Sequence, residues 1–221
     1  FLSALRSAVA RLEANVDEDR EANLRLLAED GRNVIVGVGF MFTDPMTAVA
    51  AEYPDITFGI VDSVVDAPNV RSLVFAEHEG SFLVGAAAAL KCGCDKIGFI
   101  GGQEIDLIKK FEAGYIMGAK QVKPDIDIKI QYLTQVPDFS GFNSVDKGKA
   151  AADGMYQARA DVVYHAAGGS GGGVFQAAKA ANKMAIGVDS DQALTADAAV
   201  LACRLRARQA AEEGAARHRR G

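Results

Sequence analysis

Candidate binding groups follow short apolar runs at several points in this sequence. Asp189, Gly168 and Gly169 come at or directly after the ends of two such runs, and Phe40 and Asp44 follow a third. A carboxylate accepts hydrogen bonds, glycine lets backbone amides approach a partner without a Cβ in the way, and an aromatic ring offers a flat apolar face. This combination is better suited to holding a small polar molecule that contains a ring than to cutting one.

Four β-branched runs carry or precede these residues, and each ends on glycine or a small polar residue. They are 33–40, 96–102, 161–169 and 184–191. Each is typical of a buried strand in a parallel sheet, with helix-like segments between successive strands. Ligands of open α/β sheets bind beyond the carboxyl ends of the strands. We therefore expect the function of this α/β chain to lie at these loop ends.

The elements alternate along the chain and fall into two halves. We expect helices at 19–29, 44–52, 79–90, 105–122, 145–158 and 172–181, and further strands at 56–62 and 126–133. Helical spacing places Leu107, Phe111, Gly114, Gly118 and Val122 on one face of helix 105–122. Two lobes of similar build, 1–78 and 79–192, predict a cleft between them.

Composition and charge exclude several classes of protein. The 221 residues are 49% hydrophobic, which allows one or two domains with sizeable cores. A net charge of −5 and a pI near 5.3 give no basic surface for nucleic acid. No apolar run reaches the roughly 18 to 20 residues of a membrane-spanning helix, and the N-terminal residues lack a signal-peptide pattern. The sequence opens at Phe1, which leaves secretion open.

Cysteine and histidine residues indicate no metal site and no cofactor. Cys92 and Cys94 form a Cys-x-Cys pair with a distant Cys203, which is neither a zinc-ribbon spacing nor an even disulfide set. We interpret these cysteines as small buried or incidental residues. The histidines lack metal-ligand spacing, and we interpret His165, at a strand end, as a packed, hydrogen-bonded residue rather than a ligand contact.

An ordered set of motifs gives the chain a family resemblance over roughly residues 15 to 200. The motifs are Gly37-Val-Gly-Phe40, Glu77-His-Glu-Gly-Ser-Phe-Leu-Val-Gly85, Ile97-Gly-Phe-Ile-Gly-Gly102, Phe111-Glu-Ala-Gly-Tyr115, His165-Ala-Ala-Gly-Gly-Ser-Gly171 and Gly187-Val-Asp-Ser-Asp-Gln192. With these motifs the chain resembles the basic membrane protein family of lipoproteins, the substrate-binding components of nucleoside ABC transporters. The resemblance implies a type I periplasmic-binding fold of two Rossmann-like lobes with a purine nucleoside in the cleft.

The resemblance also implies an aromatic clamp on the base. It points to Phe142 as one face of the clamp, with Phe139 as the alternative, and stacking on an aromatic ring stabilises a bound base by about 1–3 kcal/mol. Phe142 is surrounded in the sequence by Ser, Gly and Asn, so we expect core burial less than for Phe99 or Phe111. Phe40 is expected to approach the ligand from the other lobe.

Each of the remaining candidates could either contact the ligand or have a purely structural role. Asp189 could accept hydrogen bonds from a ribose diol, or cap the helix that follows. Gly168 and Gly169 could bring backbone amides to the ligand, or form an ordinary turn. Asp44 could accept from a base edge, although its place before a proline favours a helix N-cap.

The resemblance further implies an ABC transporter permease as partner and an extracytoplasmic location, with a lipid anchor absent from this chain. Two departures from the family pattern predict a chain truncated at both ends. No Asp-x-x-Phe-Asn motif precedes residue 20, and the last 20 residues hold six arginines and no lysine, against seven arginines and eleven lysines in the first 200. We expect 193–221 to be an atypical basic tail, loosely ordered from about 202 and resembling the product of a frameshift.

Two other functions remain open from the residues themselves. A cytoplasmic ligand-sensing module of the same fold would carry a DNA-binding helix-turn-helix, and none is visible. An enzyme on this scaffold is the weaker alternative. Gly37-Val-Gly-Phe40 lacks the third glycine of a dinucleotide fingerprint, the glycines at 168–173 are not followed by Gly-Lys-Ser/Thr, and no Gly-x-Ser-x-Gly is present. We therefore expect a binding protein that performs no chemistry.

Overall fold

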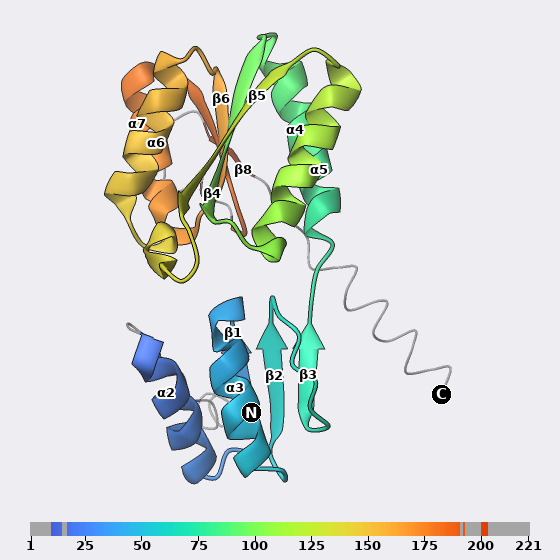
Figure 1. Cartoon of the computed structure of the whole chain (residues 1–221), viewed down its shortest axis with the longest axis vertical. Coiled ribbons are helices and arrows are strands. Elements are labelled where there is room, and N and C mark those ends of the chain that lie inside the picture. Colours follow the sequence, from blue (N-terminus) through green and yellow to red (C-terminus); the bar gives the residue numbers. More distant parts are fainter. Residues whose placement is uncertain (1–9, 15–16, 191, 193–199, 203–221) are drawn as a thin grey trace, which may run out of the picture. The chain divides into compact units, whose positions relative to one another are not determined.

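The computed structural model describes residues 10–14, 17–190, 192 and 200–202. The described residues divide into two compact units between Phe75 and Ala76, close to the boundary that the sequence analysis placed after residue 78. Figure 1 identifies the helices and strands of the two units.

Unit 1 is a small parallel sheet with two helices. Its elements are α2 (Asp17–Glu29), β1 (Val34–Val38), the 3-10 helix η1 (Phe40–Phe42), α3 (Thr43–Glu52), β2 (Thr57–Val61) and β3 (Val70–Leu73). The strands lie in the order β1-β2-β3 and all run parallel. The core joins the two helices to the sheet through Leu24, Ile35, Met46, Phe58 and Ile60.

Unit 2 is a five-stranded parallel sheet covered by helices on both faces. Its elements are α4 (Glu77–Cys92), β4 (Lys96–Gln103), α5 (Asp106–Val122), β5 (Asp127–Thr134), η2 (Phe139–Phe142), α6 (Val145–Gln157), β6 (Val162–Ala166), η3 (Gly168–Ser170), α7 (Gly171–Ala181), β7 (Met184–Gly187) and β8 (Val200–Ala202). The strand order is β5-β4-β6-β7-β8. Helices α4 and α5 cover one face, and α6 and α7 cover the other (Figure 1).

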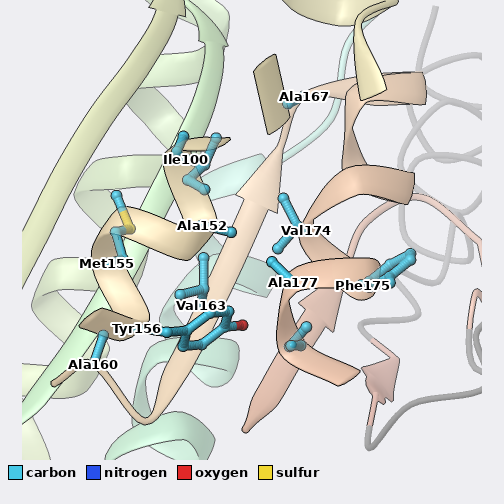
Figure 2. Close-up of a cluster of buried hydrophobic side chains, with 13 residues drawn as sticks. Ile100, Ala152, Met155, Tyr156, Ala160, Val163, Ala167, Val174, Phe175 and Ala177 are labelled. Carbon is cyan, nitrogen blue, oxygen red and sulfur yellow. The ribbon is translucent and has the colours of Figure 1, made fainter. Parts of the chain in front are cut away.

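Small side chains let the helices of unit 2 approach closely. Figure 2 shows Val163 of β6, Ala152 of α6 and Val174 of α7 in one cluster of buried side chains, and all three are fully buried. On the other face a Cβ built on Gly118 of α5 would lie 1.8 Å from the carbonyl oxygen of Phe82 in α4. The two helices therefore pack backbone against backbone, which only glycine at this position allows.

The buried face of α5 differs from the expected one. Phe111, Gly114 and Gly118 are buried as predicted, but Leu107 is only half-buried and Val122 is 37% exposed. The inward positions are instead shared with Ile108, Tyr115 and Ala119. The glycines of α5 pack against α4, and Tyr115 packs against Phe99 of the sheet. The buried surface of α5 therefore covers a different set of positions from the single face that we expected.

The other predicted helices and strands are confirmed to within about three residues at most ends. Strand β4 continues to Gln103, and the short strand β8 pairs with β7 within the region 193–221 that we expected to be a tail. The rest of the tail, which we expected to be loosely ordered, lies outside the described residues.

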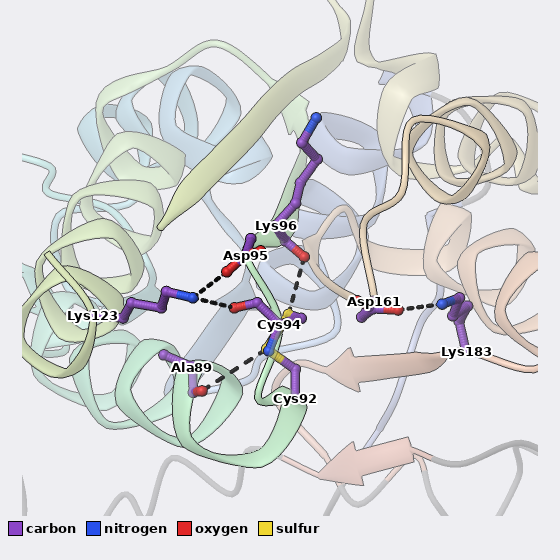
Figure 3. Close-up of a disulfide and its surroundings, with 8 residues drawn as sticks. All are labelled: Ala89, Cys92, Cys94, Asp95, Lys96, Lys123, Asp161 and Lys183. Carbon is purple, nitrogen blue, oxygen red and sulfur yellow. Dashed lines mark hydrogen bonds and ion pairs between the residues drawn. A yellow bond between two sulfur atoms is a disulfide. The ribbon is translucent and has the colours of Figure 1, made fainter. Parts of the chain in front are cut away.

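Cys92 and Cys94 are joined by a disulfide, which corrects their interpretation as incidental residues (Figure 3). Both are half-buried where α4 ends. The Cys-x-Cys spacing fits neither a metal site nor a long-range disulfide framework, because this bond joins residues only two positions apart.

Candidate functional site

The sheet of unit 2 has a topological switch point between β4 and β6. The chain passes from β4 to β5 on one side and then crosses to β6 on the other side of β4. The loops that leave two such strands diverge, and the crevice between them is where open α/β sheets bind ligands. The relevant loops begin at Glu104 and at Ala167.

Phe142 lies at this switch point. A Cβ built on Gly102 would lie 2.5 Å from ring carbons of Phe142, and one built on Gly168 or Gly169 would lie 3.0 or 3.3 Å from its carbonyl oxygen. The structure thus brings together three of the predicted site residues, Phe142, Gly168 and Gly169. Phe142 is only 8% exposed, so our expectation that it would be less buried than a core residue was wrong. Gly102 leaves the space that its ring fills.

A buried serine joins the two loops. The Ser170 hydroxyl donates to the carbonyl oxygen of Gly141 at 2.7 Å and accepts from the backbone N–H of Ser144 at 2.9 Å. Ser170 is fully buried, so these bonds fix η3 against η2 away from competing water. These two hydrogen bonds therefore fix the loop that carries Phe142 to η3.

The outer side of η2 carries a polar network. Lys147 donates to Ser140 at 2.6 Å and to Asp138 at 3.3 Å, and Asp138 accepts from the backbone N–H of Ser140 at 2.9 Å. Hydrogen bonds from Ser140, with help from Lys147, lower the pKa of Asp138. Phe139 begins the same turn and is half-buried, so it leaves more ring surface accessible than Phe142 does.

Two buried polar side chains lie at the same strand ends. Gln103 is fully buried and its amide donates to the carbonyl oxygen of Asp138 at 3.2 Å. His165 is also fully buried, and a Cβ on Gly171 would lie 2.0 Å from its ring. Burial lowers the pKa of His165 to about 4, and the proximity of the Gln192 side chain opposes the shift. The packing predicted for His165 is confirmed, but neither ring nitrogen makes a hydrogen bond of normal geometry within the described residues, so the predicted hydrogen bonding is not.

Asp189 lies at the same edge of the sheet. Tyr164 of β6 pairs with Ile186 of β7, so Asp189 and Ala167, each three residues further on, come level beside the glycine loop. Asp189 has a positive φ of 64°, and its backbone turns away from the strand direction there. The residue is exposed, yet partial desolvation by surrounding protein raises the pKa of its carboxyl.

Phe40 and Asp44 lie in unit 1. Phe40 is half-buried at the start of η1, directly after β1, and Asp44 is exposed in the first turn of α3. The expected N-cap role of Asp44 was wrong, because α3 begins one residue earlier and its N-cap residue is Phe42, with no side-chain cap. The proline at position 45 is the third residue of α3, two positions beyond the N1 position that we assumed.

Asp62 is a candidate that the sequence analysis missed. The pairing of Val38 with Val61 places Asp62 level with Gly39, next to Phe40, and its φ is 67°. Val61-Asp62-Ser63 repeats the sequence and the backbone turn of Val188-Asp189-Ser190. This repeated Val-Asp-Ser sequence in the two halves of the chain is the signal that could have identified Asp62.

Neither a metal centre nor a membrane span emerges from the described part of the chain. No three His, Cys, Asp or Glu side chains of the described residues gather as a metal ion would require. Over the same residues, no helix combines the length and apolarity needed to cross a membrane.

Comparison with known sequences decides the family. Residues 3–209 match the family described as ABC transporter substrate-binding protein PnrA-like. The chain belongs to this family. The matched range extends beyond the 15–200 that we expected from the motifs, and the resemblance to basic membrane proteins is confirmed.

Curated relatives of the PnrA-like family are longer than this chain. The ABC transporter nucleoside-binding protein BmpA of Lactococcus lactis subsp. cremoris (strain MG1363) is 42% identical over 189 residues, which cover 81% of this chain and 52% of the relative. Basic membrane protein B of Borreliella burgdorferi (strain ATCC 35210) is 35% identical over 218 residues, which cover 89% of this chain and 62% of the relative. The chain thus spans about half the length of the first relative.

Solved structures give the same fold. An ABC transporter solute-binding protein from Aeropyrum pernix K1 matches with a TM-score of 0.71 and 27% identity, covering 81% of this chain and 52% of that protein. Together with the family match, this confirms the type I periplasmic-binding fold. Transcription regulators match as well, at 24%, 15% and 14% identity, a likeness that shows the fold alone.

Proposed function

We propose that this PnrA-like chain contributes the ligand-binding lobes of an extracytoplasmic substrate-binding protein, which holds a purine nucleoside for an ABC transporter permease. The observation that carries the proposal is the meeting of Phe142, Gly168 and Gly169 at the switch point of unit 2, with Asp189 on the same sheet edge. Family membership and the printed name of BmpA support a nucleoside as the ligand.

The two kinds of group suit the two ends of a nucleoside. An aromatic ring on η2 stacks on the purine, which contributes about 1–3 kcal/mol per base. The carboxylate of Asp189 accepts from the two hydroxyls of the ribose, and a hydrogen bond to a charged group contributes about 1.5–3 kcal/mol. In unit 1, Phe40 and the carboxylates of Asp62 and Asp44 offer a second aromatic and acidic set.

The proposal involves binding without chemistry. A nucleoside hydrolase needs a positioned acid or base at the glycosidic bond. His165 is sealed in the core and its low pKa keeps it neutral near pH 7, so it is placed to pack rather than to transfer protons. The ligand should therefore be recovered unchanged.

Calorimetry with the full-length protein tests the ligand class. Adenosine, guanosine or inosine should bind far more tightly than free ribose, and chromatography of the bound fraction should return intact nucleoside. Equal binding of ribose and adenosine would refute base stacking, while release of free base would identify an enzyme.

Variants of Asp189 test the sugar contact. Asp189→Ala should weaken ribonucleosides by about 1.5–3 kcal/mol, roughly tenfold to a hundredfold in Kd, and affect 2′,3′-dideoxynucleosides little. Asp146→Ala is the matched control, because Asp146 is an exposed carboxylate in the first turn of α6. Equal weakening of both ligand types, or of neither, would show that Asp189 does not hold the diol.

Variants of η2 test the base contact. Phe142→Leu keeps an apolar side chain over Gly102 but removes the aromatic face, and it should weaken ribonucleosides and dideoxynucleosides alike. Phe139→Leu distinguishes the two rings. If only Phe139→Leu weakens binding, the half-buried ring makes the contact and Phe142 serves to fix the loop. If neither variant does, η2 does not stack on the base.

A further inference from the structure

The disulfide between Cys92 and Cys94 lies away from the candidate binding site. It joins the last residue of α4 to the loop before β4, which begins at Lys96 (Figure 3). The strands of unit 2 are parallel, so this loop is at the amino edge of the sheet, whereas Phe142 and Asp189 are at the carboxyl edge. The proposed function of the binding site does not use this bond.

The bond is placed poorly for holding the fold together. Only Gly93 separates the two cysteines, and it takes the left-handed conformation at the end of α4, with a φ of 55°. A disulfide restricts the unfolded chain less as the loop that it closes becomes shorter. This bond closes a loop of only three residues and connects no distant segments, so it contributes little to holding the fold together.

The surroundings accept the reduced cysteines as well as the disulfide. The Cys94 sulfur lies 3.2 Å from the carbonyl oxygen of Lys96, and the Cys92 sulfur lies 3.8 Å from that of Ala89. After reduction each thiol would have a carbonyl acceptor within reach. The backbone N–H of Cys94 points at the Cys92 sulfur at 3.2 Å, where it can stabilise a thiolate.

The loop is also anchored independently of the disulfide. Lys123, which follows α5, donates to the carbonyl oxygen of Cys94 at 3.2 Å and forms an ion pair with Asp95 (Figure 3). These contacts involve no sulfur atom, so they persist when the S–S bond breaks. Both cysteines are half-buried, so neither residue is enclosed in the core away from a small thiol.

We propose that Cys92-Gly93-Cys94 is a reversible dithiol–disulfide site that exchanges with low-molecular-weight thiols while unit 2 stays folded. In the reducing direction a thiolate attacks the Cys94 sulfur, an S–S bond forms between them, and Cys92 leaves as a thiolate stabilised by the Cys94 N–H. A second thiol attacks the mixed disulfide and releases the oxidised small molecule. Two electrons enter the protein, and two protons, supplied by the two thiols, end on Cys92 and Cys94.

The test is a redox titration of the folded full-length protein. A Cys203→Ser background removes the third cysteine, which lies outside the described residues. The protein is equilibrated with mixtures of reduced and oxidised glutathione, quenched with acid and alkylated, and the peptide that spans both cysteines is weighed by mass spectrometry. We expect one reversible two-electron transition from disulfide to dithiol without denaturant, with unchanged tyrosine fluorescence.

Single-cysteine variants complete the test. Cys92→Ser should accumulate a glutathione adduct on Cys94 in the oxidising mixtures, because the thiol that would displace it is gone. A disulfide that is reduced only after denaturant is added would overturn the proposal in favour of an inert bond. Two thiols that stay reduced in every mixture would overturn it as well. Nucleoside affinity is not a readout, so failure here leaves the proposed binding function untouched.

Discussion

The buried histidine makes the stability of unit 2 depend on pH. His165 is fully buried, with its ring against Gly171 and edge-on to Phe175 at a centroid distance of 5.1 Å. Burial lowers its pKa from 6.5 to about 4, because an imidazolium would lose its hydration. The folded state therefore resists a proton that the unfolded chain accepts.

The sign and size of the effect follow from linkage. Between pH 6.5 and 4 the unfolded state binds more protons, so the free energy of unfolding falls as the pH falls through this range. With the two pKa values of 6.5 and about 4, the loss between pH 7.5 and pH 5 is about 2 kcal/mol. It rises to about 3 kcal/mol once the pH is below 4.

Urea unfolding at the two pH values measures this loss. The chain has no tryptophan, and four of its five tyrosines lie beyond Ala76, so tyrosine fluorescence reports mainly on unit 2. His165→Asn and His165→Gln remove the titrating group. Both variants should be less stable than the parent at pH 7.5, and that deficit should shrink by about 2 kcal/mol at pH 5.

Parallel losses in parent and variants would refute the reasoning, because another group would then carry the pH dependence. Two variants of different length guard against a packing defect peculiar to one. A direct readout is the chemical shift of the His165 ring in the folded parent, which should titrate near pH 4 and not near 6.5.

The remaining expectations concern packing. Gly118→Ala places a methyl group 1.8 Å from the carbonyl oxygen of Phe82 and should lower the free energy of unfolding of unit 2 by about 1–3 kcal/mol. Gly154→Ala, where nothing lies within 4 Å, is the control and should raise it by about 0.5–1 kcal/mol; equal effects in urea unfolding would contradict the helix contact. Ser170→Ala should cost about 1–3 kcal/mol and speed hydrogen exchange in η2, and unchanged exchange would show that Ser170 does not hold this turn.

The sequence predicts the elements well because their signals are local. Buried parallel strands are continuous apolar runs, and several of the helices between them end at glycine or before proline, as α3 and α4 do, so 96–100 and 184–188 needed no tertiary information. The glycines at 168 and 169 and the carboxylate at 189 were found because strand ends in such sheets meet at one edge.

The features that sequence reasoning missed depend on contacts between distant residues. Phe142 looked like an accessible loop residue, and its burial requires the empty space over Gly102, forty positions earlier. The inward face of α5 is set by how closely α4 approaches, which periodicity does not report. Asp62 was overlooked since its strand was assessed alone, without the second Val-Asp-Ser at 188–190.

Three glycines of β4 leave space that side chains from neighbouring elements fill. Cβ atoms on Gly98, Gly101 and Gly102 would each lie 2.5 Å from atoms of Met155, Tyr132 and Phe142 respectively. A side chain at each glycine position would therefore compete for the same space with the side chain of a residue much later in the sequence. Over evolutionary time such pairs should covary: homologues with alanine at position 102 should carry a smaller residue at 142, and homologues that lose the methionine at 155 are free to lose the glycine at 98. Substitution at either member alone is the change that selection should remove.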